Sequence, residues 1–125
     1  MKTLNRFVTL LVFTAFIGVN VCYGEEVVNM QYIGYHDDRI DYFIPFDQPD
    51  VYYNDVAQTI IIDGDGAVDY YDVEIAPTST FVPVISTQVN GYYDTIDISS
   101  LPQGVYCITI YSPEDNTYEG FFEIE

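Results

Sequence analysis

Residues 101–110 read LPQGVYCITI and carry the clearest structural signal in this chain. A Leu-Pro-Gln-Gly turn leads into a run in which Tyr106, Ile108 and Ile110 alternate onto one face, as in a strand. In Greek-key sandwiches, a tyrosine near the start of such a strand turns back, and its hydroxyl group bonds to the preceding corner. The spacing predicts that Tyr106 makes this tyrosine corner and belongs to the core rather than to a ligand site.

The same alternation recurs on both sides of this stretch, and Tyr, Val, Ile, Phe and Thr dominate each run, as they do in strands. No part of the chain after residue 25 shows a helical period. The runs predict an all-β fold, an antiparallel β-sandwich of about seven strands with Greek-key connections. We expect these strands at Asp41–Ile44, Thr59–Ile62, Val68–Ile75, Phe81–Val89, Tyr93–Ile98, Val105–Tyr111 and Tyr118–Ile124.

Turn residues between the runs predict how consecutive strands connect. Pro45–Asp50 follows the first strand, and Pro113–Asn116 closes a final hairpin. Asp63–Gly66 reads DGDG, and because glycine accepts a positive φ, we expect a tight hairpin that pairs the two strands it joins. Pro83 cannot donate a hydrogen bond to a sheet, so the strand that contains it should lie at an edge.

The first 24 residues have the parts of a signal peptide. Lys2 and Arg6 precede the apolar run Phe7–Val19, and the small residues Cys22 and Gly24 stand at −3 and −1 of a cut after Gly24. The run is shorter than the ~20 apolar residues of a spanning helix, which disfavours a membrane anchor, and lipidation of Cys22 is a minor alternative. We therefore expect export to the periplasm, the cell surface or the medium, without membrane insertion after cleavage.

Cleavage would leave 101 of the 125 residues, the size of one sandwich domain. We assign residues 1–24 to the signal peptide, 25–39 to an N-terminal extension and 40–125 to the β-sandwich domain. Within the extension, Val27–Tyr35 either pairs with a sheet or stays loose. Val28, Met30 and Tyr32 alternate as in a strand that could add to the sheet of a neighbouring molecule.

The charge balance limits the possible partners. After cleavage, Arg39 is the one Lys or Arg left to face 20 acidic residues, a formal charge of −19. Such a surface repels phosphate backbones and excludes nucleic acid, and it disfavours anionic lipid head groups. A cationic protein, a neutral glycan or Ca²⁺ remains compatible, although solubility alone is the simpler interpretation of the charge.

The residues offer little material for catalysis. His36 is the one histidine, and although Asp37 neighbours it, nothing resembles a nucleophile elbow. Acidic residues are plentiful, but a sandwich of this size leaves little cleft for glycoside hydrolysis. We therefore expect no enzymatic activity, no catalytic residue and no cofactor.

Cys107 is the one cysteine left after cleavage, so no disulfide can form within the mature chain. It alternates with Tyr106 and Ile108 and should face away from their side of the sheet. An exposed thiol could bridge two chains. A thiol covered by neighbouring side chains is the interpretation we favour, because free cysteine is so often buried.

Two further groups are candidate binding residues. Asp63, Asp65 and Asp69 lie in or near the DGDG turn and form a weak Ca²⁺ candidate, although Ala67 and Val68 break the EF-hand pattern and a plain turn is favoured. Tyrosines also recur in adjacent pairs, and in a strand each pair should bury one ring and expose the other. Exposed tyrosine is common in binding sites. We take as a possible binding surface Tyr53, Tyr70 and Tyr93.

Taken together, several features resemble the small secreted immunoglobulin-like proteins of unknown function that are abundant in gut Bacteroidetes. They are the signal peptide, the domain near 100 residues, the segment Ile60–Gly66 and the run from Ile96 to Tyr106 that ends with Phe122–Ile124. The resemblance covers roughly residues 40–125. It implies an immunoglobulin-like β-sandwich and an exported protein, and it brings no catalytic residues.

The C-terminal run also resembles the sorting domains of type IX secretion cargo. No cargo precedes the domain here, and the chain ends in acidic Glu123-Ile124-Glu125 where those domains usually end in basic residues, so this interpretation ranks second. The leading hypothesis is an exported binding or accessory module for an unknown protein or glycan. The alternative is an adhesive or structural surface subunit that assembles by strand addition.

Overall fold

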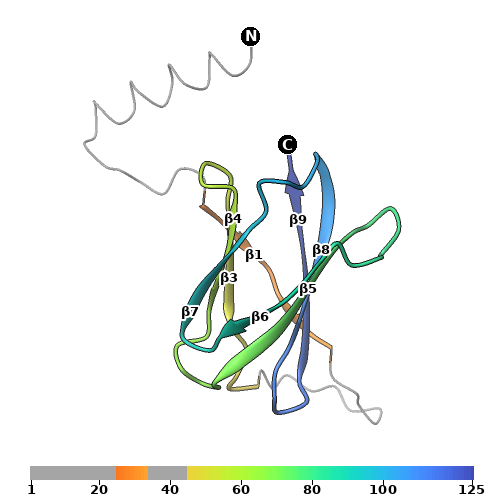
Figure 1. The fold of residues 1–125 in the computed structure, drawn as a ribbon. Helices are drawn as coiled ribbons and strands as arrows, with labels where there is room; N and C mark the ends of the chain where they lie inside the picture. The colour runs from red at the N-terminus through yellow and green to blue at the C-terminus, as the bar shows by residue number, and fades with distance from the viewer. Residues whose placement is uncertain (1–24, 34–44) are drawn as a thin grey trace, which may run out of the picture.

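A computed structural model describes residues 25–33 and 45–125 of the chain (Figure 1). These residues form two antiparallel sheets, one of four strands in the order β1-β3-β4-β7 and one of five in the order β2-β9-β8-β5-β6. They include no helix that is long and apolar enough to cross a membrane. The strands are β1 (Glu25–Val28), β2 (Gln31–Tyr32), β3 (Asp50–Asn54), β4 (Thr59–Asp63), β5 (Tyr70–Pro77), β6 (Ile85–Asn90), β7 (Tyr93–Asp97), β8 (Gly104–Tyr111) and β9 (Thr117–Ile124).

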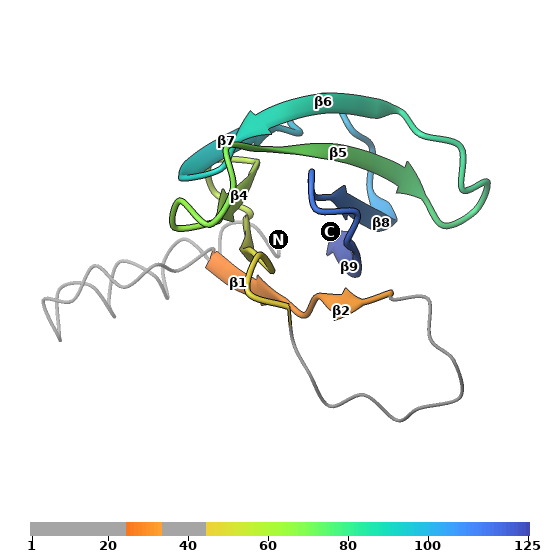
Figure 2. The ribbon, with the colours of Figure 1, turned by 90° about the horizontal axis from the view of Figure 1, so that it is seen from below.

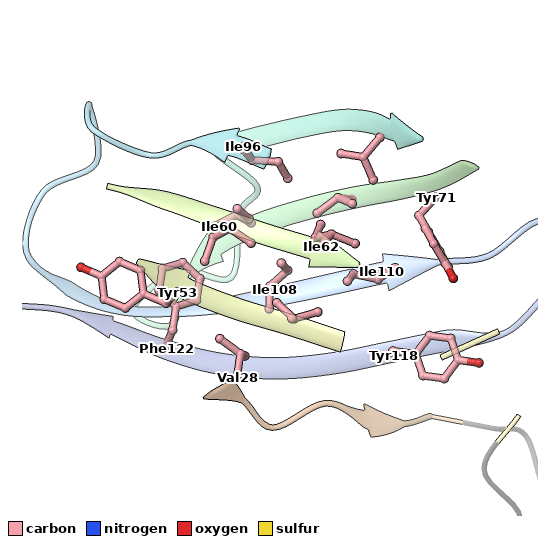
Figure 3. Close-up of a cluster of buried hydrophobic side chains, with 14 of the residues drawn as sticks. Val28, Tyr53, Ile60, Ile62, Tyr71, Ile96, Ile108, Ile110, Tyr118 and Phe122 are labelled. Atoms are coloured by element: carbon pink, nitrogen blue, oxygen red, sulfur yellow. The ribbon is translucent and has the colours of Figure 1, made fainter. Parts of the chain in front are cut away.

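The core fills the space between the two sheets. Ile60 and Ile62 of β4 face Ile108 and Ile110 of β8, and all four side chains are fully buried (Figure 3). The alternation predicted for β5 is confirmed, because Tyr71, Val73 and Ile75 point inward between exposed or half-buried neighbours. This period of two places β-branched side chains on one face of each strand, where they pack well against the opposite sheet.

The tyrosine corner is confirmed. The Tyr106 hydroxyl group donates a 2.6 Å hydrogen bond to the carbonyl oxygen of Pro102, four residues back. The ring is buried and stacks on Phe122 of the neighbouring strand, with ring centroids 5.7 Å apart. The hydrogen bond closes the corner that leads into β8, and the predicted hairpin of β8 and β9 is in place over their full length.

The edge position predicted from Pro83 is also confirmed, but the strand is shorter than expected. β6 is the last strand of the five-stranded sheet and begins at Ile85 rather than at Phe81. Phe81 lies in the preceding loop with φ of 55°, a conformation that strand residues do not adopt. The proline therefore ends the loop rather than interrupting the strand.

The prediction of a tight hairpin at Asp63–Gly66 is wrong. β4 and β5, which this segment joins, lie in different sheets, and β4 pairs with β3 and β7 instead. The turn chemistry is present, but the chain uses it to cross between the layers. β3 was not predicted: the turn expected at Pro45–Asp50 ends where this strand begins.

The described part of the N-terminal extension, residues 25–33, is paired rather than loose. β1 runs antiparallel to β3, and β2 pairs with β9, so residues 25–32 contribute an edge strand to each sheet. Val28 is buried in the core between β1 and the opposite sheet (Figure 3). The predicted signal peptide, the predicted strand Asp41–Ile44 and His36 lie outside the described residues.

A buried carboxylate in the segment that precedes β3 connects this segment to other parts of the sandwich. Asp47 is 0% exposed, and its carboxylate accepts hydrogen bonds from the side chains of Ser112, Asn116 and Tyr118. The Asn116 amide reaches both carboxylate oxygens, at 3.1 and 3.2 Å. The backbone carbonyl of Asp47 accepts a further bond of 2.7 Å from the Tyr71 hydroxyl group.

This cluster has a clear electrostatic effect on its two tyrosines. Burial first, then the negative charges of Asp47 and Asp63, raise the pKa of Tyr71 to about 12. Burial and the hydrogen bond to Asp47 raise the pKa of Tyr118 as well. Both hydroxyl groups therefore stay protonated and remain donors at neutral pH, as a buried carboxylate requires.

We expect Tyr106→Ala to be far more destabilising than Tyr70→Ala. The first change removes a buried ring and the corner hydrogen bond, at a cost of about 3–5 kcal/mol. The second removes an exposed ring, which typically costs less than about 1 kcal/mol. Urea denaturation of both variants measures the difference, and equal shifts in midpoint would contradict the role given to Tyr106.

We expect Asp47→Ala to cost about 3 kcal/mol or more, because it leaves the buried donors of Ser112 and Tyr118 and the half-buried amide of Asn116 without their acceptor. Asp47→Asn keeps one acceptor oxygen and should cost less. Asp50→Ala is the matched control, because it removes an exposed carboxylate and should stay within about 0.5 kcal/mol. If denaturation shows Asp47→Ala to be as mild as Asp50→Ala, the buried cluster does not stabilise the fold.

Candidate binding surface

Two adjacent tyrosines stand out on the surface where the chain crosses from β6 to β7. Tyr92 is 69% exposed and Tyr93 is 57% exposed. The prediction that each tyrosine pair buries one ring is wrong here, because Tyr92 lies in the turn and only Tyr93 belongs to the strand. The strand rule that alternates faces does not apply across that boundary.

The backbone of this turn is locked to the other crossing of the sandwich. The N–H groups of Gly64 and Asp65 both donate to the carbonyl of Tyr92, at 3.0 and 3.1 Å. Gly66 donates to the carbonyl of Gly91 at 2.9 Å. The two segments that pass between the sheets are therefore bonded side by side, and each holds the other in place.

Side chains fix the tyrosines from within the turn as well. The Asn90 side-chain oxygen accepts the N–H groups of both Tyr92 and Tyr93, each at 2.9 Å. The Asp94 carboxylate in turn accepts the N–H of Asn90 at 3.1 Å. Hydrogen bonds of this kind define Asx turns, and here they hold the two tyrosine backbones in one conformation.

Two glycines make the close approach possible. A side chain at Gly91 would place its Cβ 1.7 Å from the carbonyl oxygen of Val68, which no side chain can tolerate. Gly66 has φ of 78°, and a Cβ there would lie 2.6 Å from the ring of Tyr92. The Tyr92 ring therefore rests on Gly66, so that it is exposed and supported at the same time.

The structure does not bring the three predicted tyrosines into one surface. Tyr70 is exposed as expected and lies opposite Asn90 in the register, at the same end of the sandwich as Tyr93. It belongs to the five-stranded sheet, however, whereas Tyr93 pairs with Asp63 in the four-stranded sheet. We define the tyrosine turn as Asn90–Tyr93, and Tyr70 lies beside it.

The prediction that the Tyr53 ring is exposed is wrong. It is only 5% exposed and packs against Phe122 of the opposite sheet, with ring centroids 5.5 Å apart (Figure 3). Burial, together with the nearby charges of Asp55 and Glu26, raises its pKa. Its neighbour Tyr52 is half-buried on the other face of β3. The sequence alone does not show which tyrosine of this pair points inward, because the pair lies in β3, a strand that was not predicted.

The three aspartates of the Ca²⁺ candidate have separate roles in the turn. The Asp63 side chain accepts the N–H of Asp65 at 3.1 Å, and Asp65 adopts a positive φ of 54°. Asp69 contributes its backbone carbonyl, which accepts the N–H of Gly91 at 2.8 Å. Among the described residues, no three Asp, Glu, His or Cys side chains come together as a metal-binding group.

The described part of the chain contains no Lys, Arg or His, so every charged side chain there is acidic. Polar groups of the backbone take the place of cations around some of these acids. At Asp97, the N–H of Ser99 donates a 2.9 Å hydrogen bond to the carboxylate and is the main cause of its lowered pKa. The surface as a whole keeps an uncompensated negative charge.

The Cys107 thiol is covered, as favoured from the sequence. It is buried on the face of the sheet opposite to Tyr106, and its sulfur lies 3.8 Å from the Thr109 hydroxyl oxygen. Burial raises the pKa of the thiol, which reduces the fraction present as reactive thiolate. A bridge between two chains through this residue would need it to move outward.

We expect added NaCl to raise the melting temperature, because the described residues include acids but no Lys, Arg or His, and salt screens the repulsion between these acids. At ~0.1 M salt, the Debye length is about 10 Å. At matched ionic strength, CaCl₂ should give no further increase, because Asp63, Asp65 and Asp69 do not converge. Thermal melts in the two salts test this. An excess Ca²⁺ effect that disappears in Asp65→Asn would instead identify a metal site in the turn.

No family model and no curated protein matches this sequence. Among solved structures, the chain is similar to a DUF3244 family protein with an immunoglobulin-like β-sandwich fold from Bacteroides vulgatus, with a TM-score of 0.62 and 16% identity. The match covers 81% of this chain and 99% of the other. A likeness at this level of identity concerns the fold, and it confirms the fold that the sequence resemblance implied: this chain is an immunoglobulin-like β-sandwich.

Proposed function

We propose that this protein is an exported, non-catalytic binding module that takes a protein or glycan partner on its tyrosine turn. The observation that carries the proposal is the exposure of Tyr92 and Tyr93 on a backbone that is bonded from two sides. Two neighbouring tyrosine rings that are more than half exposed, on a backbone held in one conformation, offer a rigid and amphipathic contact surface.

The rigidity of this turn favours binding energetically. Association costs about 0.5–1.5 kcal/mol for each flexible side chain that becomes ordered, and tyrosine has only two side-chain torsions to lose. A backbone already held by Asn90, Gly64 and Gly66 has little further entropy to lose. A ring face can then stack on a sugar or an apolar side chain, while the hydroxyl group hydrogen-bonds to polar atoms.

The charge around the turn narrows the class of partner. Asp65, Asp69 and Asp94 lie within or next to the two crossings, and the described residues supply no cation to neutralise them. A partner that carries phosphate or many carboxylates would be repelled. A cationic protein surface or a neutral glycan would not.

Two observations support a binding role over a catalytic one. Within residues 25–33 and 45–125 there is no histidine to act as a base, and the thiol of Cys107 is buried. Export, which we infer from the predicted signal peptide, would place such a module at the periplasm, the cell surface or the medium.

The alternative of a surface subunit that donates its N-terminal strand receives less support. β1 and β2 already pair with β3 and β9 of their own chain. Donation to a neighbour would require this segment to leave its own sheet and expose Val28, which is buried in the core.

We expect binding to depend on Tyr92 and Tyr93 together. The probes are an array of neutral oligosaccharides and a set of immobilised lysine-rich peptides, and the double variant Tyr92→Ser/Tyr93→Ser should bind the recognised probe at least about tenfold more weakly. Phe121→Ser is the matched control, because Phe121 is an exposed aromatic residue on β9, which β8 and β5 separate from β6 and the turn that follows it. Equal loss in both variants, or no effect of either, would overturn the role of the turn.

A further inference from the structure

The edge strand β6 lacks the usual protection against pairing with another chain. Edge strands normally carry charges, proline or bulges, or are very short. β6 is six residues long and reads ISTQVN, without a charged residue. The neutral segment is longer still, because residues 75–93 contain no Asp, Glu, Lys, Arg or His in a chain with 20 acids.

The other three edges of the described sheets are protected. β1 begins with Glu25 and Glu26, and β7 carries Asp94 and Asp97. β2 has only two residues. The absence of charge at β6 is therefore a local feature of one edge, which lies on the outer rim of the five-stranded layer (Figure 2).

The hydrogen-bond pattern shows which backbone groups of β6 are open. Gly91 donates to the carbonyl of Asp69 at 2.8 Å, and bonded and non-bonded pairs alternate along an antiparallel ladder. In the register of β5 and β6, Val89, Thr87 and Ile85 fall in bonded pairs. The N–H and C=O groups of Ser86 and Gln88 therefore point away from β5, and no described strand pairs with β6 on that side.

Exposed apolar side chains flank both ends of this open edge. Before β6, the loop that leaves β5 exposes Phe81, Val82 and Val84, which we call the apolar tip. This loop projects beyond the sheet (Figure 1). After β6 comes the tyrosine turn. A strand added to β6 would run between these two apolar groups and could contact both.

Acids that have no cationic partner in the described part of the chain lie directly behind the edge. Asp72 and Glu74 of β5 are paired with Gln88 and Ser86 of β6, and all four side chains share the outer face of the sheet. The Gln88 amide donates a 3.2 Å hydrogen bond to Asp72. Lysine or arginine side chains on an added strand are long enough to reach over the small residues of β6 toward these carboxylates.

We propose that β6 binds an extended segment of a partner protein, in which Lys or Arg alternates with apolar or β-branched residues, by adding it as a sixth strand to the sheet. This inference rests on the proposed binding function and names the class of its partner. Backbone bonds to Ser86 and Gln88 provide affinity, and the alternating side chains provide selectivity. A second copy of this chain fits less well, because each copy carries a formal charge of −17 even before any cleavage.

The probe is a synthetic nine-residue peptide in which lysine alternates with valine and threonine, added to the purified protein. Amide hydrogen exchange should slow by about tenfold or more at Ser86 and Gln88, because these N–H groups gain bonded partners. Two control peptides should bind much more weakly. One has N-methyl groups on alternate residues, which remove the bonding N–H groups, and the other has glutamate in place of lysine.

Variants of the edge provide a second readout. Ser86→Lys/Gln88→Lys adds the charges that protect natural edges, and it should weaken binding of the lysine peptide by at least about tenfold. Ser99→Lys/Ser100→Lys makes the same change in net charge at an exposed turn outside the sheet edge. Equal loss in both variants, or binding without slower exchange at Ser86 and Gln88, would overturn strand addition and indicate general attraction of charge.

The outcomes separate this inference from the function it rests on. If the wild-type protein binds the peptide without protection of the β6 amides, and Tyr92→Ser/Tyr93→Ser abolishes this binding, then the binding function stands and strand addition fails. If the β6 amides are protected and the tyrosine variant binds as tightly as the wild type, strand addition stands and the tyrosine role fails. If the protein alone self-associates and the same amides become protected, the strand added to β6 comes from a second copy of this chain, and the proposal of a cationic partner segment is overturned.

Discussion

The buried carboxylate of Asp47 is the constraint on which much of this sandwich depends. A charge with no exposed surface and no basic residue among the described neighbours must be satisfied by neutral donors, and Ser112, Asn116 and Tyr118 supply them. These donors come from the β8–β9 hairpin, far along the chain. The entry to β3 is thereby fastened to the hairpin that begins with the tyrosine corner, and Tyr71 adds β5 to the same cluster.

The same reliance on neutral partners continues at the other crossings. The DGDG segment and the tyrosine turn bond to each other through backbone groups, and asparagine and aspartate side chains accept the remaining N–H groups. Glycine is required where the two segments meet, because Gly91 approaches Val68 too closely for any side chain. A rigid turn that exposes Tyr92 and Tyr93 is the result, and its rigidity connects the fold to the proposed binding role.

The uneven distribution of charge along the chain supports both proposed contacts, the one at β6 and the one at the tyrosine turn. Every charged residue in the described part of the chain is acidic, yet the segment from β5 through the tyrosine turn carries no charge apart from the carboxylates behind β6. A neutral edge allows a partner's backbone to approach, and the acids beside it select for cationic side chains. Strand addition at β6 and contact at Tyr92 and Tyr93 would then engage neighbouring parts of one surface.

Local patterns in the sequence were enough to predict the all-β class, the inward phase of β5 and β8, the edge position that follows Pro83 and the tyrosine corner at Tyr106. Each of these depends on a period of two, a missing N–H or a spacing of four residues, which are properties of neighbouring residues. Tertiary pairing determined the rest. DGDG has the same turn chemistry whether or not the strands on its two sides pair with each other. Tyr53 is buried because its face of β3 packs against Phe122 of the opposite sheet. Asp47 finds its donors 65 to 71 positions away in the chain. Such contacts leave no local pattern, because their energy is gained only when distant segments meet.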